Sequence, residues 1–564
     1  MKPAILVLLG SRRLMLSRTL LLLNALALQA ACAFALHESF DVREATIDDV
    51  HNALFTGLTT CRGVVSAFLS RIEELNPVIN AIIGLNPDAL AIADEMDQRI
   101  AAGNVTGKLF CIPVLLKDNY DATPMNTTGG CMALAGKRPA KDASTVKALK
   151  REDAIILGKA NMHEMALEGL SVSTLGGQTF NPYDQTRTPG GSSGGTGAAI
   201  ATSFAVFGTG TDTVNSLRSP ASANNLVSVR PTRGLISRAG VIPVSYTQDT
   251  AGPIARNIKD LAIALTVMAS IGFDEADNVT ALPPPEVVGK DYSAKLHGGH
   301  LKGLRFGVLN GFWNHTASSE TTPIINVMDD MIKFLKSEGA HVVNITEDAV
   351  FNATVILAKL DVQQYEYREL LDAHLTGSGS DRTAPTNFNE LYTKGKFIVI
   401  PSQYAYVNNA FVSSTGSESY ALRQLGIKNL TNALLSTFSG EKLDALIYPE
   451  QKNLVVKIGA PSQSGRNGIL AALTGVPVVT VPAGFSPQSE DAPIGVPIGM
   501  EIMGLPFSEG KLLNIASHIT HLHSMRKMPT FANHSVEVKE YSVVPMIRPN
   551  RCNIPAAYPI GVLS

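Results

Sequence analysis

The spacing of apolar residues switches between a helical and a strand-like pattern, and these switches predict the first elements of the chain. From residue 58 to 77 (L-T-T-C-R-G-V-V-S-A-F-L-S-R-I-E-E-L-N-P) apolar positions recur at helical spacing, which predicts a helix that stops at Asn76-Pro77. The apolar run L-F-C-I-P-V-L-L-K-D-N (109–119) predicts a buried strand that presents Lys117 at its C-terminal tip. A helix from about Asp142 and a strand in A-I-I-L-G-K-A-N follow. This alternation favours an α/β layered domain.

The second half of the chain gives clear patterns mainly near its end. Three apolar runs, D-A-L-I-Y-P-E, T-G-V-P-V-V-T-V-P-A-G-F and V-P-I-G-M-E-I-M-G, predict strands, and a helix is expected from about Ser508. The sequence has no evident internal repeat, so we expect a single domain over residues 34–545. The tail at 546–564 contains a proline-rich run around Cys552 and is expected to be tied down by a disulfide.

The first 33 residues have the pattern of a secretory signal peptide. Basic residues precede the apolar run L-L-L-L-N-A-L-A-L-Q-A-A-C-A, and no acidic residue occurs before Glu38. Ala31 and Ala33 form an A-x-A cleavage pattern, so we expect cleavage after Ala33 and a secreted mature protein. Two alternatives stay open: that Met15 is the actual start, and that the apolar run is a retained anchor, for which it is short.

Cysteines and sequons agree with export. Removing the leader leaves an even number of cysteines that could form two disulfides in an oxidising compartment, with a pairing that the sequence does not determine: Cys61, Cys111, Cys131 and Cys552. A disulfide between Cys111 and Cys131 that braces the Lys117 loop and a pair of buried thiols are equally compatible with the sequence. N-x-[ST] glycosylation sequons occur at Asn104, Asn126, Asn278, Asn314, Asn344, Asn352, Asn429 and Asn533.

Composition and charge narrow the kind of partner. With 45% hydrophobic and 17% charged residues, the chain has the composition of a globular protein with a large core. Its formal net charge of −2 gives no electrostatic reason to expect nucleic acid or an anionic membrane as partner. Small uncharged substrates fit this balance best.

A serine- and glycine-rich run, T-P-G-G-S-S-G-G-T-G (188–197), has the composition of a flexible linker. The residues after it, A-A-I-A-T-S-F-A-V-F-G-T-G-T-D-T, are small and apolar, which predicts a buried helix and a strand. Glycine-rich turns that open helices bind anions or bring backbone close to a reacting group, and the phosphate-binding patterns are absent from this sequence. Lys117, Ser192, Ser193 and Ser216 are therefore candidates for nucleophilic chemistry, because a buried neutral lysine can activate a serine.

Several motifs in order resemble the amidase signature family of serine hydrolases. They are P-V-L-L-K-D-N, G-G-S-S-G-G, G-T-D-T-x-x-S-L-R-S-P-A, S-V-R-P-T-R-G-L-I-S-R-A-G-V-I-P and Q-D-T-A-G-P-I-A-R, and the resemblance runs from about residue 45 to 530. Through K-D-N-Y-D-A-T-P-M-N-T-T-G-G the chain is most similar to peptide amidases and other small-amide hydrolases. The resemblance implies an α/β/α fold around a large mixed sheet.

The resemblance also implies a Ser-Ser-Lys triad. Ser216 matches the nucleophile, Ser192 the bridging serine in a cis peptide, and Lys117 the base that receives the proton through Ser192. Backbone N–H groups that hold the oxyanion are expected at Thr213, Val214, Asn215 and Ser216. Supporting roles are expected for Ser193, Asp212 and Arg218, and substrate contacts for Tyr246, Gln248 and Asp249.

One departure from the family pattern puts the oxyanion site in question. The family usually has two glycines before the nucleophile, where this chain has Val214 and Asn215. The N–H donors remain, but a β-branched valine does not easily adopt a positive φ if the site requires one. If the glycines only make space, Val214 narrows the pocket, and the Asn215 amide could add a donor or touch the substrate.

We therefore expect a secreted, glycosylated amidase without cofactor or metal, which hydrolyses a linear carboxamide of a small molecule or peptide through an acyl-Ser216 intermediate. The expected partners include no nucleic acid and, after signal cleavage, no membrane, and a homodimer stays open. The alternatives are the A subunit of a tRNA-dependent amidotransferase, amide transfer or cyclisation in a biosynthetic pathway, and an inactive binding protein with a closed oxyanion site.

Overall fold

The computed structural model describes residues 40–296, 300–347, 350–377 and 384–563. The expected signal peptide at 1–33 lies outside these residues. Within them, none of the helices is both long and apolar enough to span a bilayer.

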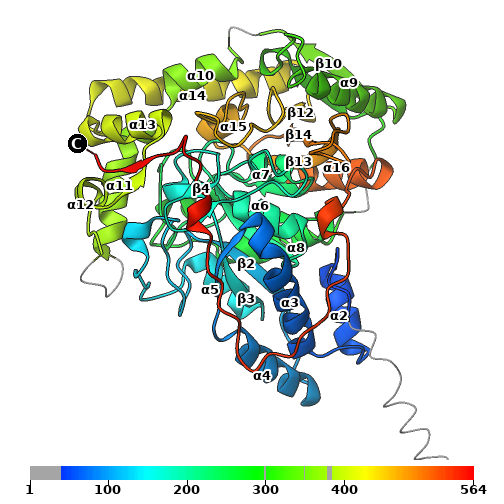
Figure 1. Cartoon of the computed structure of the whole chain (residues 1–564). Helices are drawn as coiled ribbons and strands as arrows, with labels where there is room; N and C mark the ends of the chain where they lie inside the picture. Colours follow the sequence, from blue (N-terminus) through cyan, green and yellow to red (C-terminus); the bar gives the residue numbers. More distant parts are fainter. Residues whose placement is uncertain (1–39, 297–299, 348–349, 378–383, 564) are drawn as a thin grey trace, which may run out of the picture.

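An 11-stranded mixed sheet forms the centre of the molecule (Figure 1). Six strands from the first half of the chain are contiguous, in the order β1 (Ile82–Leu85), β3 (Ile155–Ala160), β2 (Pro113–Lys117), β6 (Phe207–Asp212), β8 (Thr250–Ala255) and β7 (Val227–Arg230). The other five continue the sheet as β13 (Val478–Phe485), β14 (Pro497–Met503), β12 (Ala445–Pro449), β9 (Arg305–Leu309) and β10 (His341–Ile345). Strand β2 is parallel to β3 and β6, whereas β6, β8 and β7 pair antiparallel. The expected α/β fold with a large mixed sheet is confirmed.

Helices cover the sheet. Those of the first half of the chain are α2 (Ile47–Phe55), α3 (Cys61–Ile79), α4 (Ala89–Ala101), α5 (Ser144–Arg151), α6 (Gly194–Ala201), α7 (Arg218–Ala223) and α8 (Ile258–Met268). The second half adds α9 (Thr322–Ser337), α10 (Ala353–Leu360), α11 (Gln363–Gly377), α12 (Phe388–Lys394), α13 (Pro401–Val412), α14 (Glu418–Gly440), α15 (Ile469–Thr474) and α16 (Glu509–Leu522). Helices α6 and α7 pack on each other and on the sheet, and α8 and α16 form a second such pair.

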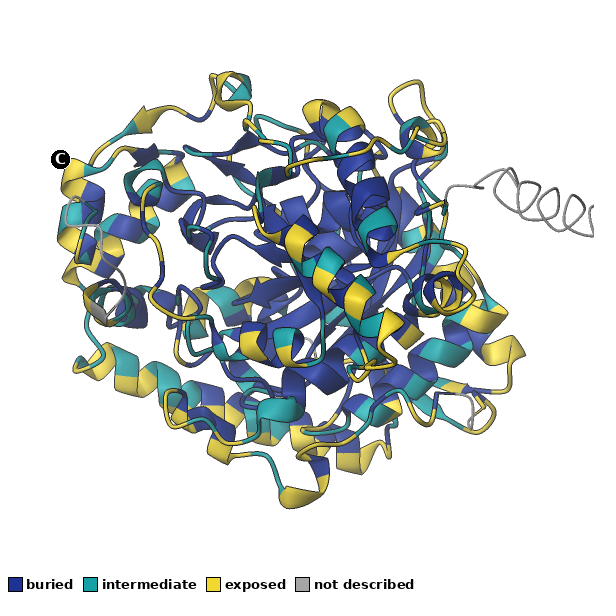
Figure 2. Cartoon of the chain, turned by 90° about the horizontal axis from the view of Figure 1, so that it is seen from below, coloured by how far each residue is buried: buried dark blue, intermediate teal, exposed yellow. Residues whose placement is uncertain are grey.

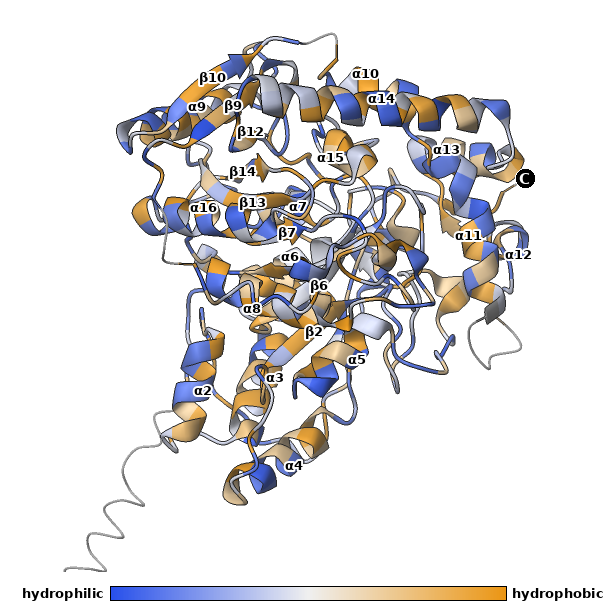
Figure 3. Cartoon of the chain, turned by 180° about the vertical axis from the view of Figure 1, so that it is seen from behind, coloured by the Kyte–Doolittle hydropathy of each residue, from blue (hydrophilic) through white to orange (hydrophobic). Residues whose placement is uncertain are grey.

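The burial of side chains follows this arrangement. Figure 2 shows the central strands and the helices packed on them as buried, with exposed residues on the outer helices. Figure 3 shows hydrophobic residues gathered along central strands such as β13, while α9 and α14 mix both kinds. Strand β2 and helix α6 are buried at every position. The polar groups that these two elements carry are therefore held in the core.

Most of the elements predicted from apolar spacing are present, and one boundary differs. The first predicted helix is α3, and it continues past Asn76-Pro77 to Ile79. Pro77 lies in the last turn, where the lost N–H removes a single hydrogen bond and the helix has room to end. It stops at Asn80, whose φ of 53° is left-handed.

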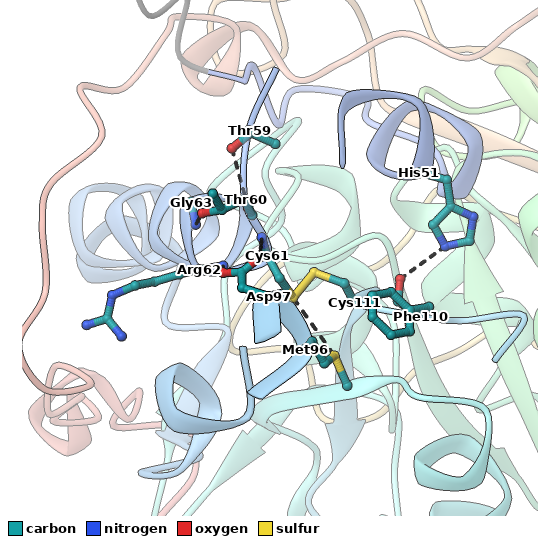
Figure 4. Close-up of a disulfide and its surroundings, with 10 residues drawn as sticks. All are labelled: His51, Thr59, Thr60, Cys61, Arg62, Gly63, Met96, Asp97, Phe110 and Cys111. Atoms are coloured by element: carbon teal, nitrogen blue, oxygen red, sulfur yellow. Dashed lines mark hydrogen bonds between the residues drawn. A yellow bond between two sulfur atoms is a disulfide. The ribbon is translucent and has the colours of Figure 1, made fainter. Parts of the chain in front are cut away.

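One disulfide joins the start of α3 to the segment before β2 (Figure 4). Cys61 is the first residue of α3, and Cys111 lies just before Pro113 at a sequence separation of 50 residues. Both cysteines are fully buried, and the backbone N–H of Cys61 donates to Asp97 Oδ1 at 2.6 Å. The link therefore anchors the strand that carries Lys117.

The expected second disulfide is wrong, and so is a bridge between Cys111 and Cys131. Cys131 is a buried free thiol and Cys552 is an exposed one. The C-terminal tail is held by other contacts: the Gln178 N–H donates to Asn553 Oδ1 at 2.8 Å, and β15 (Ile560–Gly561) pairs with β11 (Phe397–Ile398). Backbone and amide hydrogen bonds thus hold the tail in place of the expected disulfide.

Candidate active site

The buried side chain of Lys117 is the centre of the site. Its Nζ lies 2.7 Å from Ser192 Oγ and 2.8 Å from Thr211 Oγ1. Among the described residues no carboxylate forms an ion pair with it, and burial lowers the pKa of Lys117 to about 7. At neutral pH a large fraction of the side chain is therefore neutral and able to accept a proton.

Strand pairing places these groups together. Strand β2 ends at Lys117 beside β6, and the Lys117 N–H donates to Thr209 Oγ1 at 3.3 Å. Side chains at alternate positions of a strand share one face, so Thr209 and Thr211 both face the lysine. Thr211 was not predicted from the sequence, although the alternation G-T-G-T in β6 carries the signal.

The serine- and glycine-rich run is a packed part of the core, and every residue of it is buried. The Gly191–Ser192 peptide bond is cis, and the Ser192 carbonyl accepts a hydrogen bond from the His163 N–H at 3.0 Å. This bond joins two backbones, so it holds the turn without using either side chain. A Cβ at Gly195 would lie 2.1 Å from the Asn161 carbonyl oxygen, which shows why the turn needs glycine there.

The loop between β6 and α7 presents Ser216 to a cavity. The cavity has a volume of about 170 Å³ and is lined by Thr213, Val214, Asn215 and Ser216, with further walls from α10 to α13 and the segment before α15. Within the described part of the chain, the Ser216 hydroxyl makes no hydrogen bond, so Ser216 and Ser192 are not directly bonded here. The hydroxyl that the resemblance assigns as nucleophile therefore lies at a cavity wall.

Val214 and Asn215 do not require the flexibility of glycine. Neither residue is among the non-glycine residues of the described chain that have a positive φ. The Asn215 Nδ2 donates to Glu450 Oε1 at 3.0 Å, which commits this amide to the core. Burial raises the pKa of Glu450 to about 8, so this carboxyl group is mostly protonated at neutral pH.

A buried ion network lies behind the Ser216 loop. Arg218 contacts Asp212 at 3.0 Å and Glu501 at 2.9 Å, and it also donates to the Val214 carbonyl. Burial alone would raise the pKa of Asp212, but Arg218 and Arg230 together lower it to about 2. Neither Asp212 nor Arg218 lines the cavity, so their contacts hold the loop in place.

The remaining predicted residues have different surroundings. Ser193 donates to the Thr211 carbonyl at 3.3 Å. Tyr246 and Asp249 line a second cavity of about 360 Å³, which shares Thr213 with the first. Gln248 lines neither cavity, because its side chain joins the Thr213 carbonyl to the Val362 N–H.

Several residues at the cavity were missed from the sequence. The wall opposite Ser216 includes Glu168, Asp361, Tyr406 and Arg466. Asp361 and Tyr406 come from the region of α10 to α13, where apolar spacing gave no clear pattern. The described residues contain no group of three or more His, Cys, Asp or Glu side chains placed to hold a metal ion.

Comparisons with known proteins agree on one family. The family model described as Amidase matches residues 63–513. A probable amidase from Arabidopsis thaliana is 32% identical over 524 residues, which cover 89% of this chain and 94% of the relative. The second A subunit of the glutamyl-tRNA(Gln) amidotransferase of Clostridium acetobutylicum is 31% identical over 503 residues, which cover 84% of this chain and 98% of that protein.

A solved structure gives the same result. The native peptide amidase from Stenotrophomonas maltophilia superposes with a TM-score of 0.72 at 31% identity, covering 86% of this chain and 99% of that one. Matches along most of the length place this protein among the amide-hydrolysing enzymes. The chain belongs to the amidase family, and the resemblance drawn from its sequence motifs is confirmed.

Proposed function

We propose that this enzyme hydrolyses a linear carboxamide to a carboxylate and ammonia or an amine, with Ser216 as nucleophile, Ser192 as proton relay and Lys117 as base. The observation that carries the proposal is the 2.7 Å contact between Lys117 Nζ and Ser192 Oγ, made by a lysine whose pKa burial lowers to about 7. A lysine that is neutral at the working pH can accept a proton from a serine.

The reaction balances in two halves. Ser216 Oγ attacks the amide carbon as its proton passes to Ser192, and the Ser192 proton passes to Lys117. The relay then runs backwards to protonate the leaving nitrogen, which departs as ammonia or amine and leaves an acyl-Ser216 ester. Water activated by the same relay hydrolyses the ester and releases the carboxylate.

The oxyanion of the tetrahedral intermediate would be held by backbone N–H groups of residues 213–216. The φ angles of Val214 and Asn215 support an active enzyme over an inactive binding protein, because the loop contains no residue forced into the left-handed region. Arg218 supports the same loop by donating to the Val214 carbonyl.

The test is covalent labelling with a fluorophosphonate probe. We expect the wild-type protein to be labelled at Ser216, as located by mass spectrometry of the labelled peptide, and Ser216→Ala to be unlabelled. Ser193→Ala is the matched control, because its hydroxyl contacts the Thr211 carbonyl and not Lys117. A well-folded wild-type protein that fails to react would overturn the proposed nucleophile.

The labelling rate should also depend on pH. Because the neutral form of Lys117 is the base, the rate is expected to rise about tenfold per pH unit below pH 7 and to level off above it. The measurement is the rate constant for labelling between pH 5 and 9, with folding checked by circular dichroism at each pH. A flat profile over this range would show that Lys117 does not act as the base.

We also propose that the protein is secreted and glycosylated. The signal-like leader motivates this proposal, and the buried disulfide between Cys61 and Cys111 supports an oxidising compartment. Sequon asparagines at exposed positions are Asn104, Asn278, Asn344, Asn429 and Asn533. An exported enzyme fits amide hydrolysis better than the role of a tRNA-dependent amidotransferase subunit.

A further inference from the structure

The cavity at Ser216 carries an unbalanced negative charge. Its charged lining residues are Glu168, Asp361 and Arg466, two acids against one base. Arg466 Nη1 lies 3.3 Å from Glu168 Oε1, so these two charges compensate each other. The Asp361 carboxyl group is left without a cation of its own.

The contacts of Asp361 agree with this imbalance. Its Oδ1 accepts from the Gln363 N–H at 3.2 Å and from Gln363 Nε2 at 2.9 Å, and Gln248 contributes a further amide contact. In the described part of the chain it forms no ion pair. Burial raises the pKa of Asp361 more than these amides and the more distant Arg466 charge lower it, because an ionised carboxyl group away from water is unfavourable until a positive charge approaches. The group is thus prepared to receive a cation from outside the protein.

A second polar group at the same cavity lacks a partner. The Tyr406 hydroxyl oxygen is buried and has no hydrogen-bond partner among the described residues, and Tyr406 lines the cavity with Asp361. Burial raises the pKa of Tyr406, and the nearby charge of Asp361 raises it further. A phenol oxygen can accept a hydrogen bond from an N–H donor. An ammonium group placed here would satisfy both residues.

The adjoining cavity has the same bias. It shares Thr213 with the first cavity and is lined by Asp249, Glu275 and Asp277 against Arg238. Arg238 lies 2.7 Å from Asp277, so the arginine charge is already compensated. Both cavities therefore favour a positively charged ligand over a negatively charged one.

We propose that the substrate of this enzyme is an amide that carries a protonated amine, whose ammonium group pairs with Asp361 and donates to the Tyr406 hydroxyl while the amide carbonyl faces Ser216. This inference rests on the proposed function and names its substrate class. It also replaces the expectation of an uncharged substrate, which came from the net charge of the whole chain and could not resolve a local surplus of acid.

The test compares two series of primary carboxamides that differ in a single group. In one series an ammonium group is joined to the carboxamide by a linear chain of one to five methylene groups, and in the other a methyl group replaces the ammonium group. Ammonia release gives kcat/KM for each compound. At one or more chain lengths the ammonium compound is expected to exceed its methyl isostere by about 10- to 100-fold, the range of a charge-assisted hydrogen bond.

Asp361→Asn is expected to reduce this ratio by at least about tenfold, mainly through KM, and Tyr406→Phe to reduce it by a smaller factor. Glu418→Gln, an exposed carboxylate in the first turn of α14 that lines neither cavity, is the matched control and should keep the wild-type ratio. A methyl series that is hydrolysed as well as the ammonium series at every length would overturn the inference, as would an unchanged ratio in folded Asp361→Asn.

Labelling of Ser216 with the fluorophosphonate probe separates the two levels of the argument. If wild-type Ser216 is labelled but no ammonium preference is found, the proposed chemistry stands and the inferred substrate class is wrong. If Ser216 is not labelled and neither series is hydrolysed, the proposed function fails and the inferred substrate class fails with it.

Discussion

Replacing Lys117 with methionine is expected to lower kcat by at least about 10³-fold, because the side chain then has no nitrogen that could take the Ser192 proton. Methionine has a similar length and is accommodated in a buried site, so the protein should stay folded. Lys117→Arg should be equally inactive, since a guanidinium group stays protonated and cannot act as a base. The measurement is turnover of a hydrolysed amide, with thermal unfolding as the check on folding.

The two variants together separate a catalytic from a structural role. Arginine keeps a cation that can donate to Ser192 and Thr211, whereas methionine removes it. If Lys117 only held the site together by donating hydrogen bonds, Lys117→Arg would retain a substantial part of the activity. Activity within about tenfold of the wild type in either variant would exclude Lys117 as the base.

Replacing Arg218 with methionine is expected to lower the free energy of unfolding by about 3–5 kcal/mol, because two buried carboxylates lose their shared cation. Asp212 would keep Arg230 as a partner, but Glu501 would lose its ion pair with Arg218. The Val214 carbonyl would also lose its donor, so activity should fall in the protein that remains folded. Urea unfolding followed by circular dichroism measures the first effect.

An exposed ion pair gives the control for this result. Lys333 and Asp330 are 2.9 Å apart on the surface of α9, and Lys333→Met should leave the unfolding midpoint unchanged. An Arg218→Met protein as stable as the wild type would show that the buried carboxyl groups take up protons at little cost. In that case the stability of the variant should fall as the pH is raised.

The chemistry of the site was largely predictable from the sequence, because it lies in short segments with strong local patterns. Lys117 ends a continuous apolar run, and Ser192 lies in a glycine-rich turn that leads into a small apolar helix. Such patterns require neighbouring residues only. The order of the motifs then indicated the family.

The specificity of the site was not predictable in the same way. Asp361 and Tyr406 are ordinary residues in or beside helices, and only packing across long sequence distances brings them to the Ser216 cavity. The second disulfide was wrong for a related reason: an even number of cysteines permits two bridges, but the burial of Cys131 and the exposure of Cys552 depend on tertiary structure. Likewise, only the backbone conformation shows that Val214 fits where the family usually has glycine.

The order of strands in the sheet separates two kinds of evolutionary change. Lys117, Ser192 and Ser216 all come from the half of the chain that forms β1 to β8, whereas Asp361, Tyr406 and Arg466 belong to the half that contributes β9 to β14. Mutation or recombination in the second half can therefore alter which amide is accepted while the proton relay stays intact. Such an enzyme can diversify its substrates by exchanging one wall of a cavity, and a chimera with another family member would exploit the same division.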